Sequence, residues 1–79
     1  MRMTFDPDAD AAYIYIKDHL DFGEVKETHL VDVQVQEGAV ILGFDEEGRL
    51  VGVEILGARQ LIPGEVLASA ERPTGQSPQ

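Results

Sequence analysis

The sequence has no cysteine and no tryptophan, and only 6 lysines and arginines stand against 15 aspartates and glutamates. The absence of cysteine excludes disulfides, thiolate metal sites and cysteine nucleophiles. The net charge of −9 argues against binding to a phosphate backbone or to an anionic membrane surface, because both interactions need clustered basic residues. We therefore expect neither nucleic acid nor membrane as a direct partner.

Long hydrophobic runs are missing as well. The longest, Val51 to Leu56, is interrupted by Gly52 and Glu54, so no segment of the sequence can span a bilayer. No apolar stretch of signal-peptide length follows Met1. These absences predict a soluble protein located in the cytoplasm.

The chain of 79 residues allows one domain, and a single core of this size is marginally stable. Small domains usually gain the missing stability from disulfides, a metal or a second subunit. Disulfides are impossible here and no metal site is well supported. We therefore expect a homo-oligomer, most simply a dimer.

What the sequence does contain is a series of strand patterns separated by turns. The segments are rich in β-branched and aromatic residues, or they alternate between apolar and polar side chains, as strands do. In the third segment, residues 25–36, the alternation of Val31, Val33 and Val35 with polar residues predicts a half-buried strand. Five strands are predicted, at residues 1–5, 11–16, 25–36, 39–44 and 49–56. The core-facing residues of the last are expected to be Val51, Val53 and Ile55.

The turns have recognisable chemistry. Asp45 to Gly48 fits a hairpin loop on a type I turn, in which Asp45 accepts hydrogen bonds from the following backbone and Gly48 takes a positive φ. Further turns are predicted at Asp6-Pro7, where the proline ring fixes φ, and at Glu37-Gly38.

The strand pattern ends at Gly57. Residues 58–62 fit either a turn of helix or an extended segment, and Pro63 suits the first position of a helix. A short C-terminal helix is predicted from its apolar stripe at helical spacing, formed by Ile62, Val66, Leu67 and Ala70. The expected fold class is α+β, mostly β: an antiparallel sheet of about five strands built from hairpins, with one short helix. Residues 1–71 form a single compact domain in this interpretation, and residues 72–79 form a flexible tail.

Two segments of the sequence, taken together, resemble a known pattern of hairpins. Residues 3–16 read MTFDPDADAAYIYI, and residues 38–58 read GAVILGFDEEGRLVGVEILGA. In order and spacing they resemble the opening and closing hairpins of the small prokaryotic family known as domain of unknown function 2283. The sequence departs from the usual pattern at Gly43 and Gly57, where that family often has aspartate, so any role of those carboxylates would be missing here.

The resemblance implies a compact, mostly β domain, and no activity is assigned to the family. Its members are often encoded beside a small basic protein of a toxin-like type, which suggests an antitoxin-like role in binding a basic partner. The resemblance supplies no catalytic, cofactor-binding or metal-binding residues. The sequence also has no recognisable DNA-binding element of the kind that antitoxins usually carry.

Asp6, Asp8 and Asp10 have the spacing of a calcium loop. An EF-hand needs glycine at position 6 and glutamate at position 12, where this sequence has Ala11 and Lys17. We interpret the segment as a turn in which Asp6 caps backbone N–H groups while Asp8 and Asp10 are solvated. Any Ca²⁺ or Mg²⁺ is expected to bind there only weakly.

Two histidines offer a second metal hypothesis. His19 and His29 could bind Zn²⁺ together with a carboxylate such as Asp21 or Glu27. No His-x₃-His spacing supports this, so we interpret both as surface histidines. The predicted metal and cofactor sites are therefore none.

Glu54 stands out because it lies in an otherwise apolar strand and points away from the expected core face. If that face is covered, Glu54 needs a partner, and the favoured interpretation is a structural salt bridge. An acid–base role is the alternative. The cations available to it are Arg49, Arg59 and Lys17. Tyr13 and Tyr15, on the same sheet, either line a small pocket or provide hydrophobic bulk.

No serine nucleophile motif and no phosphate-binding glycine loop is present. We therefore expect a non-enzymatic, self-associating binding module whose acidic surface attracts a basic protein partner. One alternative is a ligand- or metal-binding protein or enzyme with its site at a subunit interface around Glu54. Another is a purely structural homo-oligomer.

Overall fold

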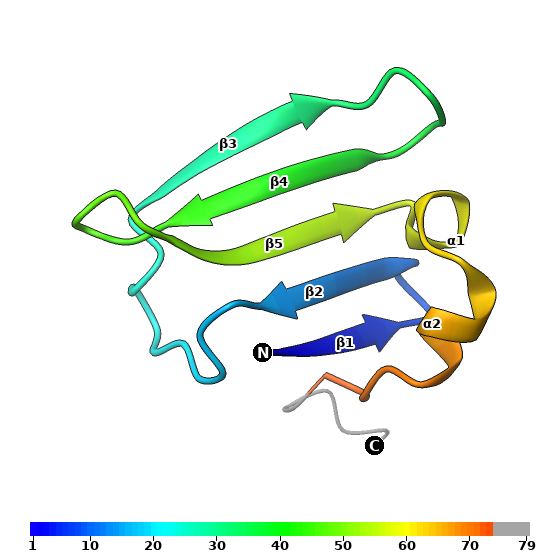
Figure 1. The fold of residues 1–79 in the computed structure, drawn as a ribbon, viewed down its shortest axis with the longest axis horizontal. Coiled ribbons are helices and arrows are strands. Elements are labelled where there is room, and N and C mark those ends of the chain that lie inside the picture. The colour runs from blue at the N-terminus through cyan, green and yellow to red at the C-terminus, as the bar shows by residue number, and fades with distance from the viewer. Residues whose placement is uncertain (74–79) are drawn as a thin grey trace.

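A computed structural model, which describes residues 1–73, shows one five-stranded antiparallel sheet with two short helices at one end of it (Figure 1). The elements are β1 (Arg2–Asp6), β2 (Ala11–Tyr15), β3 (Glu27–Asp32), β4 (Ala39–Phe44), β5 (Leu50–Leu56), α1 (Ala58–Leu61) and α2 (Gly64–Ala68). The predicted fold class is confirmed. Residues 58–62, which fit a helix or an extension, contain α1, so the sheet carries two short helices. Most of the predicted tail, from residue 74 on, lies outside the described residues.

The strand order is β1-β2-β5-β4-β3. The chain leaves β2, passes the end of the sheet to the far edge, and returns through β4 to place β5 in the centre (Figure 1). Every neighbouring pair is antiparallel. The β2–β3 loop and the β4–β5 hairpin therefore lie at the same end of the sheet, which positions the site described below.

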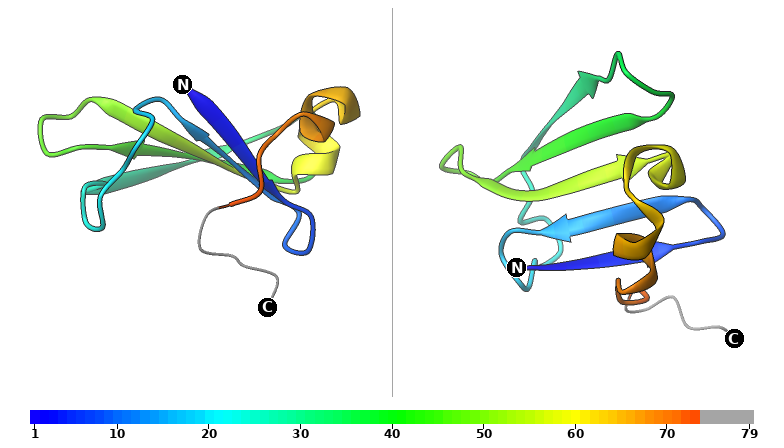
Figure 2. Two further views of the ribbon diagram at one scale, coloured as in Figure 1. Left: turned by 90° about the horizontal axis from the view of Figure 1, so that it is seen from below. Right: turned by 45° about the vertical axis from the view of Figure 1, so that its right-hand side comes forward.

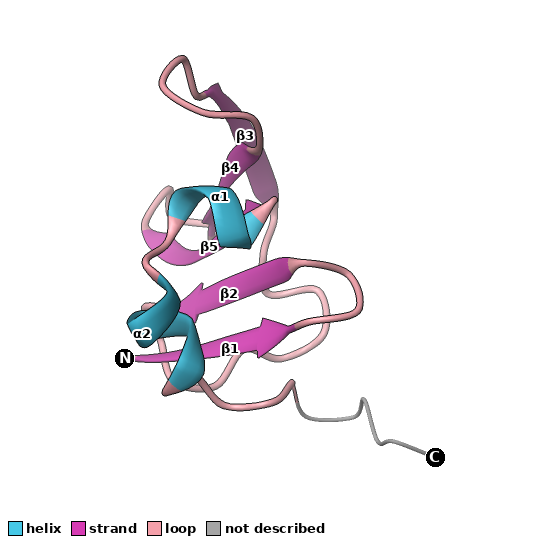
Figure 3. Ribbon diagram, turned by 90° about the vertical axis from the view of Figure 1, so that its right-hand side faces the viewer, coloured by secondary structure: helices cyan, strands magenta, loops and turns pink. Residues whose placement is uncertain are grey.

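The two faces of the sheet differ. On one, Phe5, Ala12, Ile55 and Val40 form a cross-strand row, and the helices pack over this row through residues that include Ala58 and Leu67. Figures 2 and 3 show both helices near one end of the sheet. We call this the helix face and the opposite one the open face. Among residues 1–73, no helix is long and apolar enough to cross a membrane.

The apolar stripe predicted for the C-terminal helix is only partly correct. Leu67 is buried in the core, with 8% of its surface exposed, and Ile62 packs against the same cluster. Val66 is 40% exposed, contrary to the prediction. The reason is length: α2 has five residues after the extended Pro63, so a single turn meets the sheet and only Leu67 points into it.

The prediction for the third strand was wrong in extent and burial. β3 spans Glu27–Asp32 instead of 25–36, and all six of its residues are exposed. Val35, expected to face the core, is 85% exposed. The alternating valines predicted a covered face, but β3 lies at the sheet edge farthest from the helices, and no layer of the described chain covers it (Figure 1).

The other edge of the sheet is covered. After α2 the chain runs alongside β1, where the N–H of Phe5 donates to the carbonyl of Glu71 at 2.8 Å and the N–H of Glu71 donates to the carbonyl of Met3 at 3.0 Å. This short parallel bridge occupies backbone groups of β1 that would otherwise be free.

Candidate functional site

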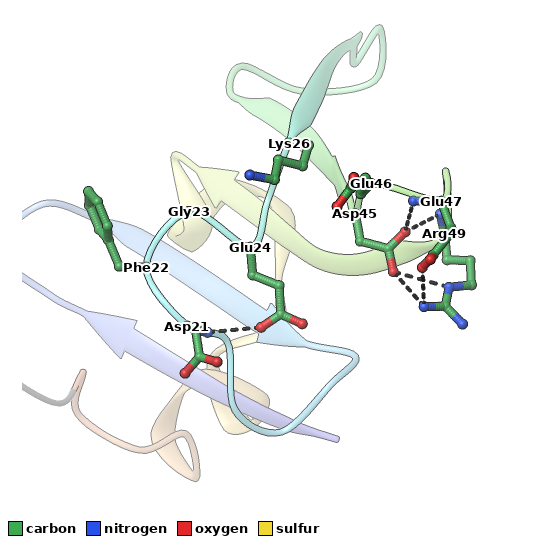
Figure 4. A pocket seen from close by; sticks show the side chains of 9 residues that line it. All are labelled: Asp21, Phe22, Gly23, Glu24, Lys26, Asp45, Glu46, Glu47 and Arg49. Carbon is green, nitrogen blue, oxygen red and sulfur yellow. Dashed lines mark hydrogen bonds and ion pairs between the residues drawn. The ribbon is translucent and has the colours of Figure 1, made fainter.

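A hollow lies between the β2–β3 loop and the β4–β5 hairpin (Figure 4). Its volume is about 350 Å³, and we call it the acidic hollow. Five carboxylates stand against two cations on its walls. The lining residues are Asp21, Phe22, Gly23, Glu24, Lys26, Asp45, Glu46, Glu47 and Arg49.

The hairpin wall is organised by Asp45. Its Oδ1 accepts hydrogen bonds from the backbone N–H groups of Glu47 and Arg49, both at 2.9 Å, and Gly48 has a φ of 78°. The predicted turn is therefore confirmed. Arg49 also donates from its side chain to Asp45 Oδ2 at 3.1 Å and pairs with Glu47 at 2.7 Å. These hydrogen bonds and the Arg49 charge lower the pKa of Asp45.

The opposite wall is organised by Glu24. Its carboxylate pairs with Lys17. It also accepts a hydrogen bond from the backbone N–H of Asp21 at 3.0 Å (Figure 4). The hydrogen bond and charge of Lys17, together with this N–H, lower the pKa of Glu24. Phe22, at the tip of the loop, is fully exposed.

The side chains of the remaining carboxylates of the hollow are exposed to solvent. The side chains of Asp21 and Glu47 are 78% and 72% exposed, and Glu46 is exposed as well. Of the two cations on the walls, Lys26 and Arg49, Arg49 is paired with Asp45 and Glu47. The hollow is therefore a net negative, open surface, suited to contact with cationic groups.

The lowered pKa of Asp45 predicts how stability depends on acid. A carboxyl whose folded pKa lies below its unfolded value stabilises the fold above the unfolded pKa, and this contribution is lost as pH falls through the folded pKa. The urea concentration at the unfolding midpoint of the wild type should thus decrease once the pH is below about 4, which is the range where ordinary carboxyl groups titrate. In Asp45→Asn, which cannot ionise, the midpoint should be lower at pH 7, and the difference from wild type should shrink toward pH 2. A constant difference across this range would contradict the assignment.

A second hollow, of about 310 Å³, lies on the open face. Tyr13 and Tyr15 meet there edge to face, with ring centroids 4.7 Å apart, and the guanidinium of Arg2 lies 4.0 Å from the Tyr15 centroid. Burial, and to a lesser degree the neighbouring Tyr15 and Glu54, raise the pKa of Tyr13. The Tyr13 hydroxyl therefore stays protonated at neutral pH, where it can donate a hydrogen bond but not act as a base. The lining residues are Thr4, Asp6, Ala9, Ala11, Ala12, Tyr13, Tyr15, Glu54 and Pro73.

Glu54 lies on the open face as predicted, directly opposite Tyr13 in the β2–β5 register. The expected salt bridge is absent from the described residues. Each candidate cation is paired elsewhere: Arg49 with Asp45 and Glu47, Arg59 with Asp10, and Lys17 with Glu24. Because the helices cover the other face, Glu54 remains partly solvated and does not need a cation.

The floor of the open face contains a feature that the sequence interpretation missed. Gly43 and Gly52 are direct cross-strand partners, and the ring of Tyr13 lies across Gly52. A Cβ at Gly52 would lie 2.7 Å from Tyr13 Cζ, which is too close for any side chain. The only available signal was the placement of two glycines inside strands, which often marks a close approach.

The N-terminal aspartates form a turn, as interpreted, with one correction. Asp6 Oδ1 accepts from the backbone N–H groups of Asp8 at 3.0 Å and Ala9 at 3.4 Å, which confirms the cap. Asp10 is not simply solvated. With a φ of 53°, it accepts from the backbone N–H of Arg59 at 2.9 Å through Oδ1. Its carbonyl accepts from the N–H groups of Gly57, which precedes α1, and of Ala58, the first residue of α1. Asp10 thus fixes the start of α1 across the fold, a contact that local sequence cannot reveal.

Neither histidine joins a metal-binding group. His19 pairs with Asp21 and His29 with Glu27, each at 2.8 Å and each on the surface, as expected. Within residues 1–73, no three histidine or acidic side chains come together in a way that could hold a metal ion. The residues of both hypothetical metal sites instead serve local turns and pairs.

Comparison with known families matches residues 2–59, most of the chain, to the family described as "Protein of unknown function (DUF2283)". The chain belongs to the DUF2283 family. The matched region of this DUF2283 protein contains all five strands, the acidic hollow and nearly all of the open-face hollow, and it ends within α1. Searches of curated proteins and of solved structures found no match.

Proposed function

We propose that this DUF2283 protein is a non-enzymatic, self-associating cytoplasmic module that binds a basic protein partner, in the manner of an antitoxin. The observation that carries the proposal is the acidic hollow, where five carboxylates stand against Lys26 and Arg49 and where Asp21, Glu46 and Glu47 are exposed to solvent. A surface of this kind attracts lysine- and arginine-rich surfaces and accelerates their encounter.

The electrostatics of the hollow favour binding over catalysis. A general acid or base at neutral pH usually has a carboxyl whose pKa is raised by burial. In the acidic hollow the pKa values of Glu24 and Asp45 are lowered by hydrogen bonds and by cations. These carboxylates therefore remain charged at neutral pH and present a constant negative field.

The small core supports self-association. Five hydrophobic residues are buried in the described chain, and none of the large side chains is completely buried. A domain of this size commonly needs a second subunit to bury enough apolar surface. β3, all of whose residues are exposed, is a strand that a second subunit can cover.

Charge variants with a matched control test partner binding. Asp21→Asn, Glu46→Gln and Glu47→Gln together remove three negative charges from the hollow. Asp8→Asn, Glu37→Gln and Glu65→Gln remove three from exposed positions elsewhere. We expect the tagged wild type to capture one basic protein from its host lysate at low salt and to release it at high salt. The hollow variant should bind that protein about 10- to 100-fold more weakly, and the control nearly as well as wild type.

Three outcomes decide between this function and its alternatives. Equal losses in the hollow variant and its control would show that overall charge, and not the hollow, attracts the partner. Capture of no basic protein would reject the proposed partner.

The open-face hollow supports ligand binding as a second candidate, because it combines a protonated Tyr13 with the Glu54 carboxylate. A small molecule that binds the wild type but not Glu54→Gln would favour that function.

A further inference from the structure

We propose that two copies of this chain pair through β3, antiparallel across a two-fold axis, to form one continuous ten-stranded sheet. The inference rests on the self-association in the proposed function and assigns it to one strand. β3 is the edge strand on the side of the sheet opposite β1 (Figure 1).

The two edges of the sheet differ in whether another segment of the described chain pairs with them. The edge of β1 is bridged by Glu71, whose backbone bonds to Met3 and Phe5. In the described part of the chain, no strand lies on the outer side of β3. An edge strand with free N–H and C=O groups is a template for pairing with another strand. β3 lacks several of the features by which edge strands usually prevent such pairing. The strand contains no proline, no lysine and no bulge against β4.

The side chains of β3 fit an edge that becomes internal. Leu30, on the open face, is 69% exposed, and Val31, on the helix face, is 41% exposed. Docking of a partner onto one face would cover one of these residues and leave the other in water. Addition of a strand at the edge gives both residues a cross-strand neighbour.

A second copy fits this edge because the strand is complementary to itself. In the two-fold register centred on Leu30, that residue lies opposite the partner's Leu30. Thr28 then lies opposite the partner's Asp32, and His29 opposite the partner's Val31. No carboxylate faces another across the pair, so the acidic ends of the strand do not oppose pairing directly. A basic partner would find its negative counterpart in the acidic hollow, at the end of the sheet, and not in this apolar centre.

A lysine substitution tests the interface. Leu30→Lys places a charge at the centre of the pair, twice in each dimer, on a side chain that the monomer already exposes. Val66→Lys makes the same charge change at an exposed valine of α2. By light scattering, we expect Leu30→Lys to raise the dimer Kd by about 100-fold and Val66→Lys to leave it near the wild-type value. If the wild type dimerises and Leu30→Lys dimerises as well as Val66→Lys does, the β3 assignment is overturned while self-association stands.

Hydrogen exchange of the β3 amides provides a readout that does not depend on a variant. The amides of residues 27–32 that point away from β4 should be protected in the wild type at concentrations where the dimer dominates, and should lose protection on dilution or in Leu30→Lys. The alternate amides, which face β4, serve as an internal control because both monomer and dimer bond them. Protection that is unchanged on dilution, in a sample shown to dissociate, would place the interface elsewhere. A wild type that is monomeric at every concentration would instead reject self-association itself.

Discussion

Leu67→Ala should lower the free energy of unfolding by about 2–4 kcal/mol, whereas Val66→Ala, one residue earlier, should change it by less than about 0.5 kcal/mol. Leu67 is 8% exposed and contacts the cluster of Ala12, Ile55 and Ala58, so its removal leaves a cavity between α2 and the sheet. Val66 is 40% exposed, and alanine is the better helix former at that position. Urea unfolding of the two variants beside wild type measures the difference.

The consequence for this chain is severe because its core is small. A domain of this size has a total stability of only a few kcal/mol, so Leu67→Ala should leave a substantial fraction unfolded at 25 °C. Unfolding should be followed at one fixed protein concentration, because self-association adds to the apparent stability. Equal losses in the two variants would show that α2 does not dock through Leu67.

Gly52→Ala should lower the free energy of unfolding by about 2 kcal/mol, because the new Cβ occupies the place of the Tyr13 ring. That Cβ would lie 2.7 Å from Tyr13 Cζ. In a Tyr13→Ala background the same substitution should cost almost nothing, since alanine suits a strand slightly better than glycine. A double-mutant cycle by urea unfolding measures the coupling.

A matched glycine separates this steric effect from a general glycine effect. Gly64, in α2, has open space around its Cα, so Gly64→Ala should be neutral or slightly stabilising. If Gly52→Ala cost nothing in the wild type, or cost the same with and without Tyr13, the packing of the tyrosine on the glycine would be contradicted.

Local chemistry explains what could be predicted from the sequence. Four of the five predicted strands agree with the observed ones to within a residue or two, because β-branched and aromatic residues fill them and turn residues bound them. The Asp45 turn was predicted with its hydrogen bonds, since an aspartate three residues before a turn glycine lies within reach of the backbone N–H groups that follow it. Asp6 followed the same rule.

The features that the sequence did not reveal depend on contacts between distant segments. Alternating valines predict a covered face, and whether β3 has one depends on where the helices lie. Asp10 bonds to Arg59, 49 residues away, and the fit of Tyr13 on Gly52 requires the β2–β5 register. The salt bridge expected for Glu54 is absent from the described part of the chain because each candidate cation pairs with another carboxylate, Lys17 and Arg49 with one close in the sequence and Arg59 with the distant Asp10.

The two proposed associations should respond to salt in opposite directions. Binding of a basic partner at the acidic hollow weakens as salt screens the attraction. Pairing of two identical chains, each with a charge of −9, strengthens as salt screens their repulsion. The direction of the salt effect therefore identifies which contact an experiment observes.

Self-association is the central claim, and multi-angle light scattering of the wild type tests it most directly. The measurement should cover micromolar concentrations at low and at high salt. We expect a mass of twice 8.7 kDa, with the dimer persisting to lower concentrations at high salt. A mass of 8.7 kDa at every concentration and at both salt levels would contradict it.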